Sequence, residues 1–304
     1  MSKPSAQSSL EKEGKQLLRF AEKVPRFRNS RLANALLKAI HYRNSDLAVW
    51  LLKNGADAHA KDHKGRSALW WAATFCQPVV VREIVRRGAE LPDDVLMGPV
   101  IEARADVVRF LINHHANVNC VASKYTGLGH LHLKEHILTV ALRTVAVHPE
   151  AESIPIMLIR AGAEVNQLTP STWFIVATGY SMLGMAAHIG LLKTVRAMIA
   201  AGANVNLRDK GGRTALFNAL EQGHLQVVAE LLRVGARTDV VDDAGITPLE
   251  AVRQQESSPQ MDRTEWVVSA GVRVNQRKRE REQREWQELR ARMIALLERH
   301  KKKK

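Results

Sequence analysis

The stretch Asp209-Lys-Gly-Gly-Arg-Thr-Ala-Leu-Phe-Asn-Ala-Leu-Glu-Gln-Gly-His-Leu-Gln-Val-Val-Ala-Glu-Leu-Leu-Arg-Val-Gly-Ala236 decides the fold of this chain. Apolar residues at spacings of three and four lie on both sides of Gly223-His224, and they predict two short amphipathic helices joined by a turn. Thr214 stands where the first helix begins, so we expect its hydroxyl to cap free backbone N–H groups. Gly235 suits a left-handed C-terminal cap. One unit therefore consists of a finger-like turn and a pair of helices.

Weaker copies of this stretch recur along most of the sequence. Successive units end in Gly-Ala or a variant of it, at intervals of 33, 27, 47, 40, 33 and 36 residues: Gly55, Gly88, His115, Gly162, Gly202, Gly235 and Gly271. A repeat with a period near 33 indicates a stacked array, in which each unit buries its apolar face on its neighbours. Such an array supplies a long surface and usually no chemistry. The functional question is therefore which partner the chain binds.

Three further segments follow one common pattern: Asp62-His-Lys-Gly-Arg-Ser-Ala-Leu-Trp-Trp-Ala-Ala73, Asp242-Asp-Ala-Gly-Ile-Thr-Pro-Leu249 and, more loosely, Ser181-Met-Leu-Gly-Met-Ala-Ala187. This pattern resembles the ankyrin repeat family, over about residues 31–275 and about seven units. The resemblance implies an all-α, ankyrin-type helix-pair solenoid with short β-hairpin fingers. Outside it, we expect a basic N-terminal capping helix with a linker in residues 1–30, and a basic C-terminal helix with a lysine tail in residues 276–304.

The middle units depart from the pattern in an informative way. Gly98-Pro99 is expected to interrupt the first helix of the unit that ends at His115. The next unit carries a long insertion over residues 119–135, and the following finger is long, over residues 166–180. Insertions in repeat arrays usually map to one face, which is often the binding face. We therefore expect the two long fingers to be neighbours that project from the same edge.

The resemblance also implies where a partner would bind. In ankyrin-like stacks the first helices and the fingers form a concave side, and one variable position of each first helix faces outward there. Here that position holds Lys38, Trp71, Val140, Met185, Asn218 and Ala251. The apolar run in the middle is typical of an interaction site, unless the long central fingers fold down and cover it. Three aromatic residues of the second long finger are further partner-binding candidates: Trp173, Phe174 and Tyr180.

The positive charge of the chain is concentrated at its two ends. The formal charge is +14, yet residues 32–270 are close to neutral, because residues 1–31 carry +5 and residues 271–304 carry +8. The C-terminal basic patch comprises Arg277, Lys278, Arg279, Arg281, Lys301, Lys302, Lys303 and Lys304. Such a patch is either a solvated tail or a handle for an acidic protein surface, RNA, DNA or an anionic membrane. The helix itself has an apolar stripe, which indicates a cap on the last repeat or, alternatively, a docking or coiled-coil helix.

The sequence contains one cluster that looks like a metal site. His130 and His132 lie in the first long insertion, and His136 follows directly after its end. Zinc sites need about four well-placed ligands, and no second cluster is obvious, so we interpret these residues as loop histidines. We expect no metal site and no cofactor. No Ser/His/Asp, Cys/His or phosphate-loop pattern is present, so we expect the protein not to be an enzyme.

The remaining features bear on the compartment of the protein. No apolar run approaches the roughly 18 residues of a membrane span, and the polar start predicts no secretory signal. Cys76 and Cys120 form no disulfide framework, which fits a reducing compartment such as the cytoplasm. We therefore expect a non-catalytic scaffold or adaptor that binds a partner protein. The alternatives are a basic adaptor that holds nucleic acid or an anionic membrane through its ends, and a secreted effector that docks on host proteins.

Overall fold

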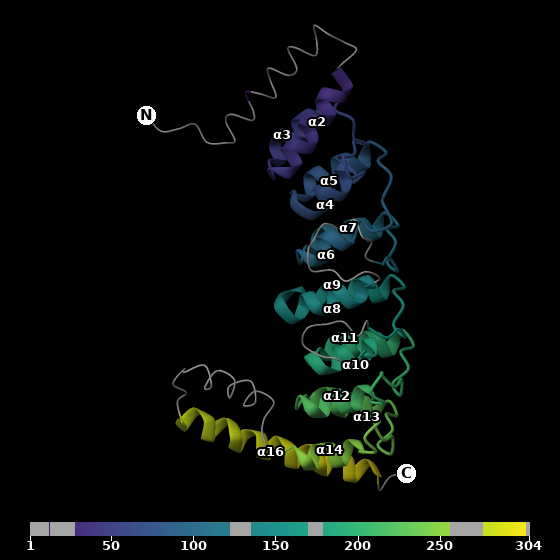
Figure 1. Ribbon diagram of the computed structural model, residues 1–304, viewed down its shortest axis with the longest axis vertical. Helices are drawn as coiled ribbons and strands as arrows, with labels where there is room; N and C mark the ends of the chain where they lie inside the picture. Colours follow the sequence, from purple (N-terminus) through teal and green to yellow (C-terminus); the bar gives the residue numbers. More distant parts are fainter. Residues whose placement is uncertain (1–11, 13–27, 122–134, 170–178, 256–275, 302–304) are drawn as a thin grey trace. The chain divides into compact units, whose positions relative to one another are not determined.

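A computed structural model describes Lys12 and residues 28–121, 135–169, 179–255 and 276–301 (Figure 1). The chain divides into two compact units, Met1–Ala161 and Gly162–Lys304. The expected N-terminal capping helix and most residues of the two long fingers lie outside the described part of the chain.

The first unit is built from consecutive helix pairs. The first helices pack one on the next to form one layer, and the second helices form a layer behind them. The first layer contains α2 (Arg28–His41), α4 (Ala68–Phe75), α6 (Met97–Ile101) and α8 (Ile137–Val147). The second layer contains α3 (Ser45–Lys53), α5 (Pro78–Arg86), α7 (Ala105–Asn113) and α9 (Ser153–Arg160), with the 3-10 helix η2 (Pro149–Glu152) between α8 and α9. The apolar faces of both layers meet in the core.

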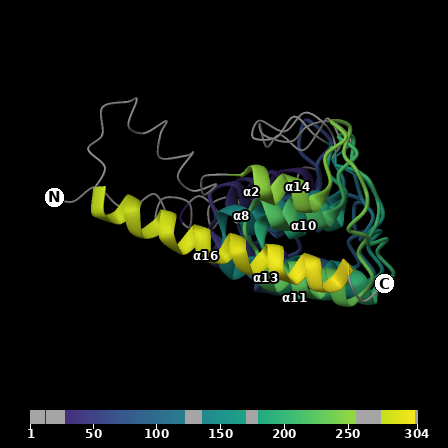
Figure 2. The same ribbon diagram turned by 90° about the horizontal axis from the view of Figure 1, so that it is seen from below.

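The second unit repeats this arrangement. Its first layer contains α10 (Met182–Ile189), α12 (Ala215–Glu221) and α14 (Pro248–Gln254), and its second layer contains α11 (Leu192–Ala200) and α13 (Leu225–Arg233). The long helix α16 (Gln276–Lys301) packs against both α13 and α14. It therefore takes the place that the second helix of the last pair would take (Figure 2).

Hydroxyl residues cap several of the first helices. The side chains of Ser67, Ser181 and Thr247 each accept a hydrogen bond from a backbone N–H of the first turn. The prediction for Thr214 is wrong, because its Oγ1 is buried and has no hydrogen-bond partner among the described residues. Its φ of −98° is more extended than the −66° to −81° of the three residues that do cap.

The predicted interruption at Gly98-Pro99 is also wrong, because both residues lie inside α6. Proline is tolerated in the first turn of a helix, where its missing N–H has no intrahelical partner in any case. Gly98 fits because α4 lies very close: a Cβ atom at this position would be 2.8 Å from the Cβ of Thr74. The pair α6 and α7 is thus short but continuous with its neighbours in the stack.

The fingers are held by aspartate side chains more than by strand pairing. Among the described residues the bases of the fingers form single antiparallel bridges, such as Lys61 with Ser67, and not the β-hairpins that we expected. In each well-formed finger an aspartate Oδ1 accepts two backbone N–H groups, two and four residues further on, at 2.8–3.0 Å. These residues are Asp62, Asp209 and Asp242. One carboxylate therefore replaces the ladder of a hairpin.

Candidate protein-binding surface

The structure contradicts most of the predicted apolar run on the first helices. Val140, Met185 and Asn218 are 0%, 1% and 0% exposed, so none of them faces solvent. Lys38 is exposed, and Trp71 and Ala251 are partly exposed. The predicted partner-binding surface therefore keeps Lys38 and Trp71 and loses its central residues.

Close helix packing is the reason for this burial. In the second unit a Cβ atom on Gly184 of α10 would lie only 2.6 Å from the Nδ2 atom of Asn218 on α12. The absence of that Cβ lets the two helices approach, and this encloses Met185 and Asn218. In the first unit every residue of α8 from Ile137 to Leu142 is buried, as expected of a helix that is apolar on all sides.

The aromatic candidates of the second long finger have different outcomes. Trp173 and Phe174 lie outside the described residues. Tyr180 is only 5% exposed, so its predicted contact with a partner is wrong. Its carbonyl accepts a hydrogen bond from the Thr169 N–H at 2.7 Å, and its ring lies 5.4 Å from that of His188. Tyr180 therefore closes the base of the finger.

Trp71 lies in a cluster of aromatic and basic side chains in the first unit. Its indole N–H donates to Asp62 Oδ2 at 3.0 Å, and the Arg66 guanidinium lies 4.1 Å from its ring centroid. The ring of Phe75, one helical turn further along α4, stacks on it at 5.6 Å. Both Trp71 and Phe75 remain partly exposed. Arginine over an indole face is a favourable cation–π geometry.

The C-terminal end of α2 extends this cluster. The ring of His41 lies 5.9 Å from that of Trp71, and the guanidinium of Arg43 lies 4.9 Å from the centroid of Phe75. Tyr42 is 64% exposed, a high value for an aromatic side chain next to other aromatic rings. We call this cluster the Trp71 surface: His41, Tyr42, Arg43, Arg66, Trp71 and Phe75.

The carboxylate of Asp62 fixes the Trp71 surface to the finger. It forms an ion pair with Arg66 at 3.0 Å in addition to its bond with Trp71. Burial by itself raises the pKa of Asp62, but the hydrogen bonds from the Arg66 and Lys64 backbone and the Trp71 indole outweigh it and lower the pKa to about 2. Asp62 is therefore charged at neutral pH and holds Trp71 and Arg66 in one arrangement.

Of the Trp71 surface, the sequence predicted only Trp71. The signal for Phe75 was present, because residues four apart share one face of a helix. His41, Tyr42 and Arg43 follow directly after the last apolar residue of α2, and an aromatic residue between two basic ones at a helix end is a weak signal. Arg66 was hidden in the finger, where it looked like a solvated turn residue.

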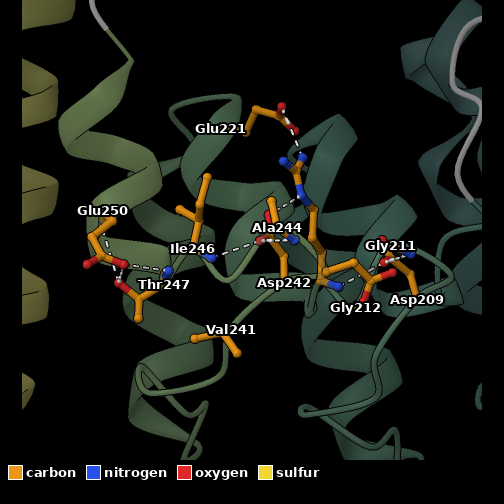
Figure 3. Close-up of polar contacts among 12 residues, drawn as sticks. Asp209, Gly211, Gly212, Glu221, Val241, Asp242, Ala244, Ile246, Thr247 and Glu250 are labelled. Carbon is orange, nitrogen blue, oxygen red and sulfur yellow. Dashed lines mark hydrogen bonds and ion pairs between the residues drawn. The ribbon is translucent and has the colours of Figure 1, made fainter.

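A second polar cluster joins two neighbouring fingers of the second unit (Figure 3). The guanidinium of Arg213 reaches Asp242 Oδ2 at 3.3 Å and Glu221 Oε1 at 3.4 Å. Burial lowers the pKa of Arg213, but the neighbouring carboxylates outweigh it and raise the pKa above its ordinary value. Burial raises the pKa of Asp209, one finger earlier. These charges hold successive fingers together, so we assign the cluster a structural role.

The C-terminal helix α16 contacts the stack with one face. Trp286, Met293 and Leu297 are at most 4% exposed, and a Cβ atom on Gly223 would lie 2.8 Å from the Trp286 ring. Arg290 donates to the carbonyl oxygen of Val252 at 2.8 Å. The N-terminal end of α16 extends past α13 in both Figure 1 and Figure 2. At 26 residues the helix is about 39 Å long, so only part of it covers α13 and α14.

The predicted basic patch lies on this helix and its tail. Arg281 is exposed and lies 3.4 Å from Glu285, and Lys301 is exposed. The side chains of Arg277, Lys278 and Arg279, and residues Lys302, Lys303 and Lys304, lie outside the described part of the chain.

The described residues offer no group of three histidine, cysteine or acidic side chains that could hold a metal ion. Of the weak metal candidates, His130 and His132 are outside the described ranges, and His136 lies directly before α8. Both cysteines are free and buried, and burial raises the pKa of Cys76 to about 11 and that of Cys120 to about 12. In the ranges that the structure covers, no helix is both long and apolar enough to cross a membrane.

Stacked helix pairs with aspartate-closed fingers define an ankyrin-type repeat protein. The sequence profile described as ankyrin repeats (3 copies) matches residues 36–122 and 145–252, more than half of the chain. The chain therefore belongs to the ankyrin repeat family, and the predicted all-α fold class is confirmed. Repeats of this family are generally protein–protein interaction modules and are typically not enzymes.

Several curated proteins are similar to parts of this chain. Ankyrin repeat domain-containing protein 63 from Homo sapiens is 46% identical over 55 residues, which are 18% of this chain and 14% of that protein. The ADP-ribosylation factor GTPase-activating protein AGD4 from Arabidopsis thaliana is 39% identical over 72 residues, 24% of this chain and 9% of that protein. The B-cell lymphoma 3 protein homolog from Mus musculus is 27% identical over 211 residues, 69% of this chain and 37% of that protein. The chain thus spans well under half the length of these relatives.

A solved structure shows the same fold. The crystal structure of the ankyrin repeat domain of Bcl-3 matches with a TM-score of 0.51 and 23% sequence identity. The match covers 71% of this chain and 92% of that domain. At this level of identity, the likeness concerns the fold alone.

Proposed function

We propose that this chain is a non-catalytic adaptor that binds a partner protein through the Trp71 surface. The observation that carries the proposal is the partial exposure of Trp71 and Phe75 beside Tyr42, which is 64% exposed. Tryptophan, tyrosine and arginine are the residues most enriched in binding hot spots. The surface combines all three on neighbouring first helices and a finger.

Rigidity supports this proposal. The Trp71 ring is held by the Asp62 hydrogen bond, by Arg66 above its face and by Phe75 beside it. A side chain that is already ordered loses little conformational freedom when a partner binds, and this improves affinity. Trp71 and Arg66 are therefore preorganised for a partner, whereas an isolated exposed tryptophan would not be.

A random-peptide display screen against the full chain tests the proposal, because such a screen requires no partner of established identity. Wild type should select peptides, and Trp71→Ala should weaken the best of them by about 30-fold, because truncation of a hot spot costs 2 kcal/mol or more. Val147→Ala is the matched control, since Val147 is 71% exposed on α8 of the same unit and lies outside the Trp71 surface. Circular dichroism checks that each variant is folded. Selection of the same peptides by wild type and Trp71→Ala with equal affinity would refute the proposal.

The helix α16 favours a second candidate function, the binding of a polyanion. Arg281, Arg284, Arg292 and Arg299 are exposed and lie on the side of α16 opposite the buried Trp286, Met293 and Leu297. Glu280, Glu285 and Glu288 are interleaved among them, which weakens the field. Fluorescence anisotropy with a labelled single-stranded RNA tests binding to nucleic acid. Sedimentation with phosphatidylserine vesicles tests binding to an anionic membrane. Binding that persists in an Arg284→Glu/Arg292→Glu variant would argue against this role.

We also propose that the adaptor works in a reducing compartment, namely the cytoplasm. Cys76 and Cys120 are free thiols in the core, and such thiols persist where disulfides are rare. Cell fractionation of the tagged chain tests this placement.

A further inference from the structure

We propose that the Trp71 surface binds an acidic peptide segment of its partner, with carboxylate side chains next to an apolar anchor. This inference rests on the proposed function, because it names the chemistry of the segment that the same surface would bind. Four features carry it: the local charge, the position of Arg43, an adjoining cavity, and the occupied faces of the aromatic rings.

The local charge around the Trp71 surface is strongly positive. Residues 28–66 contain eight Lys and Arg residues against three Asp residues, a net charge of +5. Asp62 is already paired with Arg66. Lys38, Arg43, Lys61 and Lys64 form no ion pair with any described residue, and the same holds for Lys53 of α3. Charge complementarity therefore favours an acidic partner.

Arg43 is the group best placed to bind a carboxylate. Its guanidinium carbon lies over the Phe75 ring, 4.9 Å from the centroid, and the Arg43 side chain is exposed. The N–H groups of a guanidinium point outward along its edge and can bind a carboxylate through two parallel hydrogen bonds. Arg66 has less capacity, because its Nε already donates to Asp62. We therefore assign the main carboxylate contact to Arg43, in the turn that follows α2, with Lys38 near the C-terminal end of α2 as a second cation.

A cavity next to the surface can take the following part of the segment. Its volume is about 420 Å³, and it lies between the finger and the chain after α5. Trp70, Leu91 and Pro92 give it an apolar lining, and Lys61, Lys64 and Arg66 line it on the side of the finger. Glu90 and Asp94 also line it, so a bound carboxylate would turn toward the finger. The volume is enough for one or two side chains.

The aromatic rings themselves argue for a peptide and against a nucleic acid. Sequence-tolerant binding of single strands uses aromatic faces on which bases stack. Here Arg66 and Phe75 already stack on Trp71, and Arg43 lies over Phe75. The rings are therefore engaged with arginines, whose outward N–H groups suit carboxylates. Tyr42 supplies the exposed apolar contact.

The peptides selected by the wild-type chain provide the test. Asp and Glu should be enriched among the peptides that depend on Trp71, and replacing these residues by Asn and Gln in the best peptide should raise its Kd at least tenfold. The double variant Lys38→Glu/Arg43→Glu should weaken the same peptide about tenfold at 0.15 M salt. This difference should shrink at 1 M salt, where the Debye length falls from about 8 Å to about 3 Å.

A second double variant serves as the matched control. Lys53→Glu/Arg82→Glu makes the same change in net charge on exposed residues of α3 and α5, in the second layer. It should leave Kd within twofold of wild type. Equal losses in both double variants, or an amide peptide that binds as well as the acidic one, would overturn the inference. Peptides that depend on Trp71 but are neutral or basic would also overturn it and leave the proposed function standing.

Discussion

The substitution Gly98→Ala tests the packing that keeps the irregular α6 in the stack. A Cβ atom at position 98 would meet the Cβ of Thr74 at 2.8 Å and its Cγ2 at 3.1 Å, and would overlap its Oγ1. Rotation of Thr74 can move Oγ1 and Cγ2, but the position of its Cβ is fixed by the backbone of α4. Thr74 is also 1% exposed and donates to the Trp70 carbonyl at 2.9 Å, so it is held in place. The two helices must therefore move apart.

The magnitude follows from two opposing effects. Overpacking of a dense core costs about 1–3 kcal/mol, and a contact between two rigid Cβ atoms belongs near the upper end of that range. The exchange of glycine for alanine in a helix returns at most about 1 kcal/mol. We therefore expect Gly98→Ala to lower the free energy of unfolding by about 2 kcal/mol.

Urea unfolding, followed by tryptophan fluorescence and circular dichroism, measures this change. Gly88→Ala is an instructive companion, because Gly88 has a φ of +81° and open space around its missing Cβ. It should cost about 1–2 kcal/mol through backbone strain alone. Thr74→Ala removes the Oγ1 and Cγ2 contacts but keeps the contact with the Cβ atom, so it should rescue only part of the loss in Gly98→Ala and none of the loss in Gly88→Ala. A Gly98→Ala variant as stable as wild type, or a rescue that is equal in both backgrounds, would refute the steric argument.

Three further outcomes are expected. The folded-state pKa of Asp62 is about 2 and lies below its ordinary value of 3.8, so its contribution is present above pH 4 and is lost as the pH falls toward 2. The stability difference between wild type and Asp62→Asn should therefore be roughly 1–2 kcal/mol at pH 6 and shrink below pH 4; a constant difference would contradict this. Iodoacetamide at pH 8 should modify Cys76 and Cys120 at least tenfold more slowly in the native chain than in urea, and equal rates by mass spectrometry would disprove their burial. Trp286→Ala should destabilise the second unit by about 3–5 kcal/mol and speed hydrogen exchange in α13, whereas unchanged exchange would show that α16 does not hold that layer.

Local patterns in the sequence predicted most of the fold. The register of the repeats and the helix pairs follow from short-range rules. The predictions at Gly98-Pro99 and at Thr214 failed for reasons that short-range rules do not contain. They depend on how closely the neighbouring helix approaches and on small differences in backbone angles. These distances are set by residues many positions away, such as Thr74 for Gly98.

The candidate site was harder to predict. The outward position of a first helix is a property of an average repeat, and in this chain Gly184 brings α10 and α12 close enough to enclose Met185 and Asn218. Trp71 stays partly exposed, and the residues that surround it come from α2, α4 and a finger. No single repeat contains this combination, so the pattern of one repeat predicts the tryptophan but not the residues around it.

The position of α16 has a consequence for how the chain is made. The ribosome releases the helices of the second unit in order, so α13 and α14 emerge before α16, which covers their apolar faces. Trp286, Met293 and Leu297 are the last large apolar side chains to arrive on that surface. Until they arrive, the growing chain exposes an apolar surface of the kind that chaperones and proteases recognise. A message cut short before α16 would therefore yield a product marked for degradation, even with every finger and most helix pairs intact.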